Sequence, residues 1–256
     1  PRRDTVERVA RDGLCAQCGT CVAACPVRAV EMRETPSGMF LPRVDAARCN
    51  GCGLCVKLCP GLAFDLGLLG GADPFVGVIR AAFAARAADP ALGCTGQSGG
   101  LVTALLLHLL ESRQADAALV TVMPSDGSLR PEPLLARTRP EVLAAQGSKY
   151  SAVAGNRALN LLDAVERVAA VALPCALQGL HTLQQRGHTQ ASKVRFRIGL
   201  FCDRTLLRTC AEQMAADARL PRDSIAALEY RSKARAGWPG EVAFLLKDGR
   251  RAFFPP

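Results

Sequence analysis

Two cysteine runs with the same spacing lie close to the start of the chain. Residues 15–26 read CAQCGTCVAACP and residues 49–60 read CNGCGLCVKLCP. Each follows the pattern C-x-x-C-x-x-C-x-x-x-C-P, with glycine directly after the second cysteine. Thiolates are soft ligands that suit iron–sulfur clusters and zinc. Metal chemistry therefore constrains this segment more than a hydrophobic core of its own does.

The pattern is typical of bacterial ferredoxins, in which the fourth cysteine of each run binds the cluster of the other run. It predicts one 4Fe–4S cluster on Cys15, Cys18, Cys21 and Cys59, and a second on Cys49, Cys52, Cys55 and Cys25. Gly19 and Gly53 suit tight loops in which a side chain would crowd the cluster. Pro26 and Pro60 turn the chain after the fourth ligand. Zinc sites and a disulfide framework are the alternatives, but neither requires the same run twice with the same proline.

Composition bounds the rest of the chain. With 256 residues, of which 49% are hydrophobic, it can form a substantial core and two domains. The net charge of +9 could attract nucleic acid, anionic lipid or an acidic redox carrier. Because lysine and arginine are scattered and no basic run is interleaved with aromatic residues, we expect no nucleic-acid site.

The remaining cysteines and the apolar segments bear on location. Four of the twelve cysteines lie outside the two runs, namely Cys94, Cys175, Cys202 and Cys210. Cluster thiolates need a reducing environment, so we expect a cytoplasmic protein. The start of the chain has no apolar signal core, and the apolar stretch 101–110 is too short to span a bilayer. We expect contact with a membrane only through a partner, and we interpret Cys94 and Cys210 as structural.

The order of elements predicts an N-terminal ferredoxin-like module over 1–65, then a linker and helix over 66–97, then a mixed α/β domain over 98–256. The module includes an extended insert at 38–44, and the linker a helix over 78–89 that ends at Pro90. In the third segment helices are expected over 101–113, 140–146, 156–166, 175–187 and 205–218, and strands over 117–123, 131–138, 167–174 and 194–202. This alternation indicates a largely parallel sheet. A hairpin turning at Asp248–Gly249 occupies 241–254, and because the chain stops directly after it, we expect a C-terminal portion to be missing.

Two motifs suggest a second site. In QSGGLVT (97–103), Ser98 is a candidate N-cap, and the glycines before the helix suit a bound phosphate. A plainly capped helix is the alternative. In GSKY (147–150), Lys149 could pair with a phosphate and Tyr150 could stack on a ring. The alternative is a glycine C-cap followed by a surface lysine.

Two cysteines are predicted at the ends of strands. LPCALQGL (173–180) places Cys175 at a strand-to-helix turn, where α/β sheets bind ligands and a helix N-terminus lowers a thiol pKa. A buried structural cysteine is the alternative. GLFC (199–202) places Cys202 at the end of another strand, and Trp238 in GWPG is expected to border the same crevice.

Taken in order, SGGLVTALL, ARTRPEVLAAQGSKY, VALPCALQGLHTLQ, IGLFC and YRSKARAGWPG resemble the beta subunit family of coenzyme F420 hydrogenases and dehydrogenases. Several members of that family begin with a two-cluster ferredoxin module. The resemblance implies FAD in the α/β domain and a two-electron partner such as the deazaflavin coenzyme F420. The residues that it implies around the flavin are Ser98, Gly99, Gly100, Thr103, Gly147, Ser148, Lys149, Tyr150, Pro174, Cys175 and Gln178. The stretch between Tyr230 and Trp238 is longer than is usual in the family, and the family's C-terminal part is absent.

We therefore predict an iron–sulfur flavoprotein oxidoreductase, or a subunit of one. It would move electrons between a two-electron carrier and one-electron acceptors through FAD and two 4Fe–4S clusters. Its expected partners are the carrier and either other subunits of a redox complex or a ferredoxin. The main alternative is a flavin-free relay or assembly subunit, and a structural or regulatory cluster protein is the third. The sequence identifies no catalytic residue.

Overall fold

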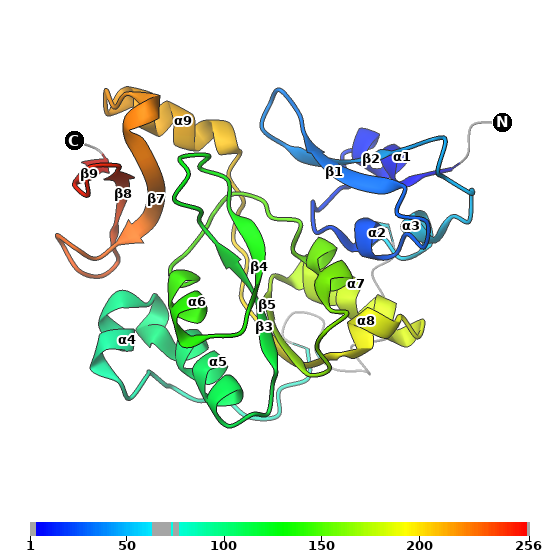
Figure 1. Ribbon diagram of the computed structural model, residues 1–256, viewed down its shortest axis with the longest axis horizontal. Coiled ribbons are helices and arrows are strands. Elements are labelled where there is room, and N and C mark those ends of the chain that lie inside the picture. The colour runs from blue at the N-terminus through cyan, green and yellow to red at the C-terminus, as the bar shows by residue number, and fades with distance from the viewer. Residues whose placement is uncertain (1–3, 63–72, 74–76, 255–256) are drawn as a thin grey trace.

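The computed structural model describes residues 4–62, 73 and 77–254. It is a mixed α/β structure with an N-terminal ferredoxin-type module, a four-stranded sheet flanked by helices, and a three-stranded sheet near the C-terminus (Figure 1). Part of the linker expected over 66–97 lies outside the described residues. Within the described parts of the chain, no helix is both long and apolar enough to cross a membrane.

The ferredoxin module is built from short elements. They are the helices α1 (Val6–Arg11), α2 (Thr20–Ala23) and α3 (Leu54–Lys57) and the strands β1 (Val30–Glu34) and β2 (Phe40–Val44). The two strands form an antiparallel hairpin in which Glu34 pairs with Phe40. Helices α2 and α3 begin directly after Gly19 and Gly53, whose φ angles of 79° and 71° are left-handed. Glycine takes this conformation without a steric penalty, which explains its place in both runs.

The central sheet has the strand order β4-β3-β5-β6. Its strands are β3 (Ala117–Val122), β4 (Glu132–Ala136), β5 (Val168–Ala172) and β6 (Val194–Gly199). Strands β3, β5 and β6 are parallel, and β4 pairs antiparallel with β3 at one edge. The predicted largely parallel sheet is therefore present. Because side chains alternate along a strand, Ala117 and Leu119 face one core and Ala118 and Val120 face another.

Helices cover both faces of this sheet. On one face lie α4 (Pro90–Thr95), α5 (Leu101–Glu111) and α6 (Arg139–Ala144). On the other lie α7 (Pro174–Gln185), α8 (Thr189–Ser192) and the 3₁₀ helix η3 (Gly155–Leu161). Figure 1 shows α7 and α8 on the side of the ferredoxin module, whereas α4, α5 and α6 lie away from it.

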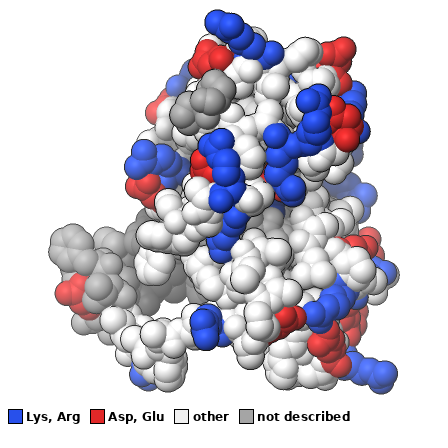
Figure 2. Space-filling view, turned by 90° about the vertical axis from the view of Figure 1, so that its left-hand side faces the viewer, with Lys and Arg blue, Asp and Glu red and all other residues white. Residues whose placement is uncertain are grey.

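The C-terminal part forms the third unit. It contains α9 (Arg208–Asp217), η4 (Arg222–Ser224) and the strands β7 (Ile225–Ser232), β8 (Glu241–Leu246) and β9 (Arg251–Phe254). The three strands form an antiparallel sheet in the order β7-β8-β9 around the buried side chains of Phe244 and Ile225. The predicted hairpin turns at Asp248–Gly249, but β7 was not predicted. On the face seen in Figure 2, basic and acidic side chains are interspersed.

Three local predictions were wrong. Residues 78–89 are not helical, because Val78, Ile79 and Phe83 are exposed and Ala87 alone of this stretch is buried in a core, which is too little apolar contact to stabilise a helix. Pro90 begins α4 instead of ending a helix, with the Asp89 side chain accepting from Ala91 N. Ser98 makes no capping hydrogen bond, since α5 starts after Gly100 in a left-handed conformation. The helix expected over 156–166 is the 3₁₀ helix η3, which ends at Leu161.

Candidate functional site

Four cysteines from both runs gather against the rest of the molecule. Burial raises the pKa of Cys15, and the nearby thiolates of Cys18 and Cys59 raise it further. Burial likewise raises the pKa of Cys21, followed by the effects of Cys18, Cys15 and Cys59. Cys59 therefore lies with the first run although it belongs to the second.

The second group has the reciprocal composition. Burial raises the pKa of Cys55, and the thiolates of Cys25, Cys49 and Cys52 add to that effect. Cys55 also acts on Cys21, so the two groups are neighbours. This is the exchange of fourth cysteines that the ferredoxin pattern predicts. The binding of clusters by these eight thiols remains a prediction.

The arrangement bears on the zinc and disulfide alternatives. All cysteines lie in the described residues and all are free. In the described parts of the chain, no three His, Cys, Asp or Glu side chains gather closely enough for one metal ion. The free thiols do not form the disulfide framework, and the choice of clusters over zinc rests on the repeated cysteine pattern.

The two groups differ in exposure. In the first group Cys18, Cys21 and Cys59 are buried. In the second group Cys52 is exposed, and the following Leu54 is 36% exposed. The first group thus faces the interior of the molecule, and the second lies at its surface.

The first cysteine loop docks on η3 and α7 through buried polar contacts. Asn156 donates from its backbone N–H to Cys18 O at 3.0 Å. Its side-chain Nδ2 donates to Thr20 Oγ1 at 2.9 Å and to Ala176 O at 2.8 Å. Thr20 and Asn156 are 1% and 3% exposed, so solvent does not compete for these bonds. The contacts fix the loop of the first group on the α/β domain.

Small and apolar side chains complete this interface. A Cβ on Gly179 would lie 2.0 Å from Thr20 Oγ1, and one on Gly19 would lie 2.9 Å from Ala154 O. Ala23, Ala24 and Leu58 of the module belong to the same hydrophobic core as one face of the central sheet. The module and the α/β domain therefore share buried surface rather than meeting at a wet contact.

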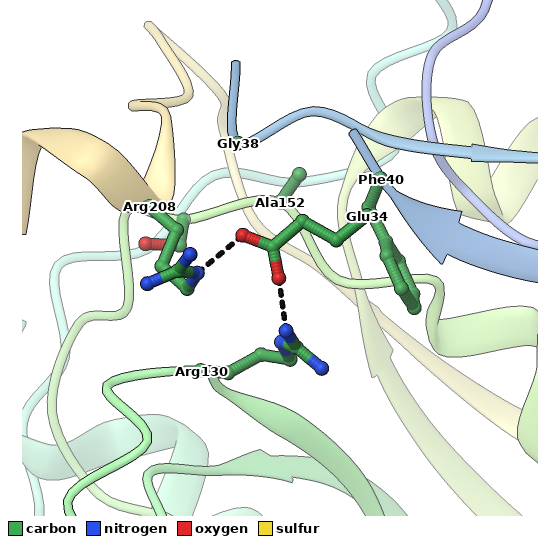
Figure 3. A pocket seen from close by; sticks show the side chains of 7 residues that line it. Glu34, Gly38, Phe40, Arg130, Ala152 and Arg208 are labelled. Atoms are coloured by element: carbon green, nitrogen blue, oxygen red, sulfur yellow. Dashed lines mark hydrogen bonds and ion pairs between the residues drawn. The ribbon is translucent and has the colours of Figure 1, made fainter. Parts of the chain in front are cut away.

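A second contact joins the β1–β2 hairpin to the α/β and C-terminal parts. Figure 3 shows the Glu34 carboxylate ion-paired with both Arg130 and Arg208 beside a small pocket. Arg208 also pairs with Glu212 on α9. The Glu34 side chain is 13% exposed, so the surrounding protein screens this cluster less than water would. Three parts of the chain are thus held together at one carboxylate.

Cys175 lies at the start of α7, at the carboxyl end of β5, as predicted. Its Sγ is 4.0 Å from Ala16 O in the first cysteine loop. Burial raises its pKa to about 11, and the thiolates of Cys18 and Cys202 contribute in the same direction. The expected lowering by the helix N-terminus is therefore wrong, because desolvation of the thiolate outweighs the helix dipole. The thiol lies between the first cysteine group and the sheet edge.

The glycines before α5 pack against their own chain. A Cβ on Gly99 would lie 2.9 Å from the Cβ of Arg86, and one on Gly100 would lie 2.3 Å from Leu92 O. Gly99 O accepts from Ala87 N at 2.8 Å. The absence of side chains here serves a close approach of two backbone segments.

The 147–150 segment has two roles in the fold. The Lys149 ammonium donates to the carbonyls of Ala145, Gln146 and Gly147 at 2.6, 2.8 and 3.1 Å, which caps the C-terminus of α6. Burial lowers its pKa to about 8. The Tyr150 ring lies edge-to-face with Tyr230 at 5.4 Å. The predicted alternative, a glycine C-cap followed by a surface lysine, was also wrong, because Ala145 is the C-cap residue and the Lys149 ammonium itself contacts the last carbonyls of the helix.

The structure places residues that flank the two motifs in contact. Thr95 Oγ1 lies 3.0 Å from Gln146 Oε1, and Gln97 Nε2 donates to Arg231 O at 2.6 Å. Gln97 Oε1, Gln146 Nε2 and Gln178 Nε2 are buried and find no hydrogen-bond partner among the described residues. Because buried polar atoms normally find a partner, these amides suit a bound polar group. Trp238 is 76% exposed in the loop after β7.

Thr20, Asn156, Gln97 and Gln146 were missed as candidate site residues. Gln97 is the first residue of the motif QSGG and Gln146 directly precedes GSKY, and these positions are the signal that could have found them. Thr20 and Asn156 are 136 residues apart, and no spacing links them.

Paired cysteine groups of this pattern are typical of iron–sulfur proteins. A sequence profile described as a 4Fe–4S dicluster domain matches residues 14–63. Profiles of the coenzyme F420 hydrogenase/dehydrogenase beta subunit match residues 82–160 for its N-terminal part and 165–254 for its C-terminal part. The chain belongs to this family.

Curated relatives agree with the profiles. A coenzyme F420-dependent sulfite reductase of Methanocaldococcus jannaschii is 28% identical over 77% of this chain and 32% of its own length. The beta subunit of coenzyme F420 hydrogenase from Methanosarcina barkeri is 29% identical over 51% of this chain and 46% of its own length. The chain thus spans less than half of these relatives.

A solved structure supports the fold. One chain of the F420-reducing nickel–iron hydrogenase complex from Methanosarcina barkeri superimposes with a TM-score of 0.51 at 23% identity. The match covers 66% of this chain and 57% of that chain.

Proposed function

We propose that the chain is an iron–sulfur flavoprotein oxidoreductase, or the corresponding subunit of a complex. It moves electrons between a two-electron carrier, such as reduced coenzyme F420, and a one-electron acceptor. The observation that carries the proposal is the grouping of eight cysteines into two sets, one docked on the α/β domain and one exposed.

The eight cysteines of the two runs are the proposed cluster ligands. The first 4Fe–4S cluster is held by Cys15, Cys18, Cys21 and Cys59, and the second by Cys49, Cys52, Cys55 and Cys25. Iron binds the thiolate form, and its positive charge would offset the desolvation that raises the pKa of Cys15 and Cys55 in the metal-free chain. Exposure at Cys52 gives a one-electron partner, a ferredoxin or another subunit, access to the second cluster.

FAD is proposed at the carboxyl edge of the central sheet. The N-termini of α5 and α7 lie at that edge, because α5 precedes β3 and α7 follows β5. The unpartnered amides of Gln97, Gln146 and Gln178 fit a polar cofactor. When bound, a flavin couples two-electron and one-electron carriers. The surrounding residues are Ser98, Gly99, Gly100, Thr103, Gly147, Ser148, Lys149, Tyr150, Pro174, Cys175 and Gln178.

The carrier and location follow by analogy. Relatives are named for coenzyme F420, and the net charge of +9 favours an acidic carrier over a basic one. Iron–sulfur thiolates require a reducing compartment, so we place the protein in the cytoplasm.

The experiment is anaerobic purification of the full chain, with iron, sulfide and released flavin quantified. About eight irons and one FAD per chain are expected. Reduced coenzyme F420 should then bleach the visible absorbance of the clusters, whereas reduced nicotinamide should do so far more slowly. Zinc in place of iron would contradict the proposal.

Paired cysteine variants test the exchange of ligands. A Cys21→Ala/Cys59→Ala chain should lose one cluster, because both residues serve the first. A Cys55→Ala/Cys59→Ala chain should lose both. If each run held its own cluster, the two results would be reversed. Cys94→Ala, which is exposed and outside both groups, is the control and should keep all of its iron.

One observation favours a flavin-free relay instead. The space beside Gly99 and Gly100 is occupied by Arg86 and Leu92 of the same chain. About eight irons with no flavin, from chain purified with excess FAD, would select the relay.

A further inference from the structure

A hydrogen-bond chain runs from the α/β domain to a predicted cluster ligand. Thr20 Oγ1 lies 2.9 Å from Asn156 Nδ2 and 3.1 Å from Cys18 Sγ. The same Nδ2 lies 2.8 Å from Ala176 O, which can only accept. That carbonyl fixes which end of the Asn156 amide faces Thr20.

The direction of the chain follows from this orientation. An amide nitrogen can only donate, so Thr20 Oγ1 accepts the hydrogen from Asn156. The hydroxyl hydrogen of Thr20 is then directed at Cys18 Sγ, which as a ligand is a thiolate and accepts. With Thr20 and Asn156 both almost fully buried, water does not offer the hydroxyl another partner.

The second cysteine run lacks this donor. Its residue between the second and third cysteines, after the glycine, is Leu54, where the first run has Thr20. Leu54 is 36% exposed and has no hydroxyl. The two otherwise similar loops therefore differ in a hydrogen bond to sulfur.

We infer that Thr20 raises the reduction potential of the first cluster and that Asn156 is a positioning residue that acts through Thr20. A hydrogen bond to a ligand sulfur stabilises the additional negative charge of a reduced cluster. The inference rests on the proposed cluster at Cys15, Cys18, Cys21 and Cys59. Through Asn156 and Thr20, the α/β domain would then control how readily the first cluster accepts an electron.

The test is a redox titration of the full, anaerobically purified chain, followed by electron paramagnetic resonance. The signal of the first cluster is identified by its loss in Cys59→Ala. Thr20→Val keeps the shape of the side chain and removes the hydroxyl. At a fixed potential it should lower the ratio of reduced to oxidised first cluster about tenfold, a shift of about 59 mV for one electron.

Three further variants separate tuning from structure. Thr20→Ser keeps the hydroxyl and should restore the potential. Asn156→Ala should shift the potential in the same direction by less, and should add nothing in a Thr20→Val background, because the two act in series. Leu54→Val is the matched control in the second run and should change neither potential.

An unchanged potential in Thr20→Val with the cluster bound would overturn the inference. So would an equal shift in Leu54→Val. If Thr20→Val fails to hold the cluster, Asn156→Ala decides, and an unchanged potential there overturns the inference. Wild-type chain without a cluster at this site would overturn the proposed function as well, so the two failures are distinguishable.

Discussion

A methyl group on Gly179 should disrupt the docking of the first cysteine loop on α7. In Gly179→Ala the new Cβ would lie 2.0 Å from Thr20 Oγ1 and 2.9 Å from both Thr20 Cβ and Cγ2. Thr20 is 1% exposed, so it is enclosed by neighbouring atoms. Either Thr20 or the whole helix must therefore move.

One stabilising and two destabilising effects determine the change in the free energy of unfolding of Gly179→Ala. Alanine is better than glycine inside a helix by about 1 kcal/mol. Overpacking a buried site costs about 1–3 kcal/mol. Displacing Thr20 also leaves the buried Asn156 amide without one acceptor, a loss of about 1–3 kcal/mol. Mid-range values predict a net loss in the free energy of unfolding of about 3 kcal/mol, which lowers the melting temperature by roughly 6–12 °C in a chain of this size.

The assay is thermal unfolding of the iron-loaded chain under anaerobic conditions, followed by far-ultraviolet circular dichroism and by cluster absorbance. Gly155→Ala is the matched control, since it lies in η3 near the same interface and nothing is within 4 Å of its Cβ. It should differ from wild type by less than about 0.5 kcal/mol. A Gly179→Ala chain that is as stable as wild type, or more stable, would refute the tight contact.

Three further perturbations have defined outcomes. Glu34→Gln removes the ionic bridge to two partly exposed arginines and should lower the free energy of unfolding by about 1–2 kcal/mol in low salt and by less in 0.5 M salt, as measured by urea unfolding. Burial lowers the pKa of Lys149 from 10.5 to about 8, so between these values the unfolded chain binds a proton that the folded chain has released, and stability should rise with pH across this window. Lys149→Met should remove that rise in a pH series of urea unfolding curves. Cys175, with its pKa raised to about 11, should react with iodoacetamide at pH 8 far more slowly than the exposed Cys202, as followed by peptide mass spectrometry of the metal-free chain, and equal rates would contradict its burial.

The sequence could predict the strands that are marked by continuous apolar runs. The strands over 117–123 and 167–174 are apolar runs between helices, and they form the centre of the sheet. The strand β7 was missed because its sequence IAALEYRS mixes alanines and charges, although most of its residues are buried. The alanine-rich stretch 78–89 has helix propensity, but propensity alone does not hold a helix that has no packed face.

Some features of the candidate site could likewise be predicted from the sequence, and others could not. Cysteine spacing encodes the chemistry of a cluster locally, so the ligand groups could be proposed from the chain alone. The contact between Thr20 and Asn156 joins residues 136 positions apart, and only the fold brings them together. The predicted lowering of the Cys175 pKa was wrong for a related reason, because the depth of burial at a helix start depends on the tertiary structure.

The shared core of the two parts limits how this architecture can have been assembled. Sequence profiles divide the chain between residues 63 and 82, as if a ferredoxin had been joined to an independent domain. Yet Ala23, Ala24 and Leu58 are buried in the core of the sheet domain. A ferredoxin module transplanted to another protein would carry this apolar face with it and would tend to self-associate. Shuffling of the module between proteins therefore requires co-inheritance of a matching surface, and a fusion that lacks one should be recovered as aggregates rather than as a working hybrid.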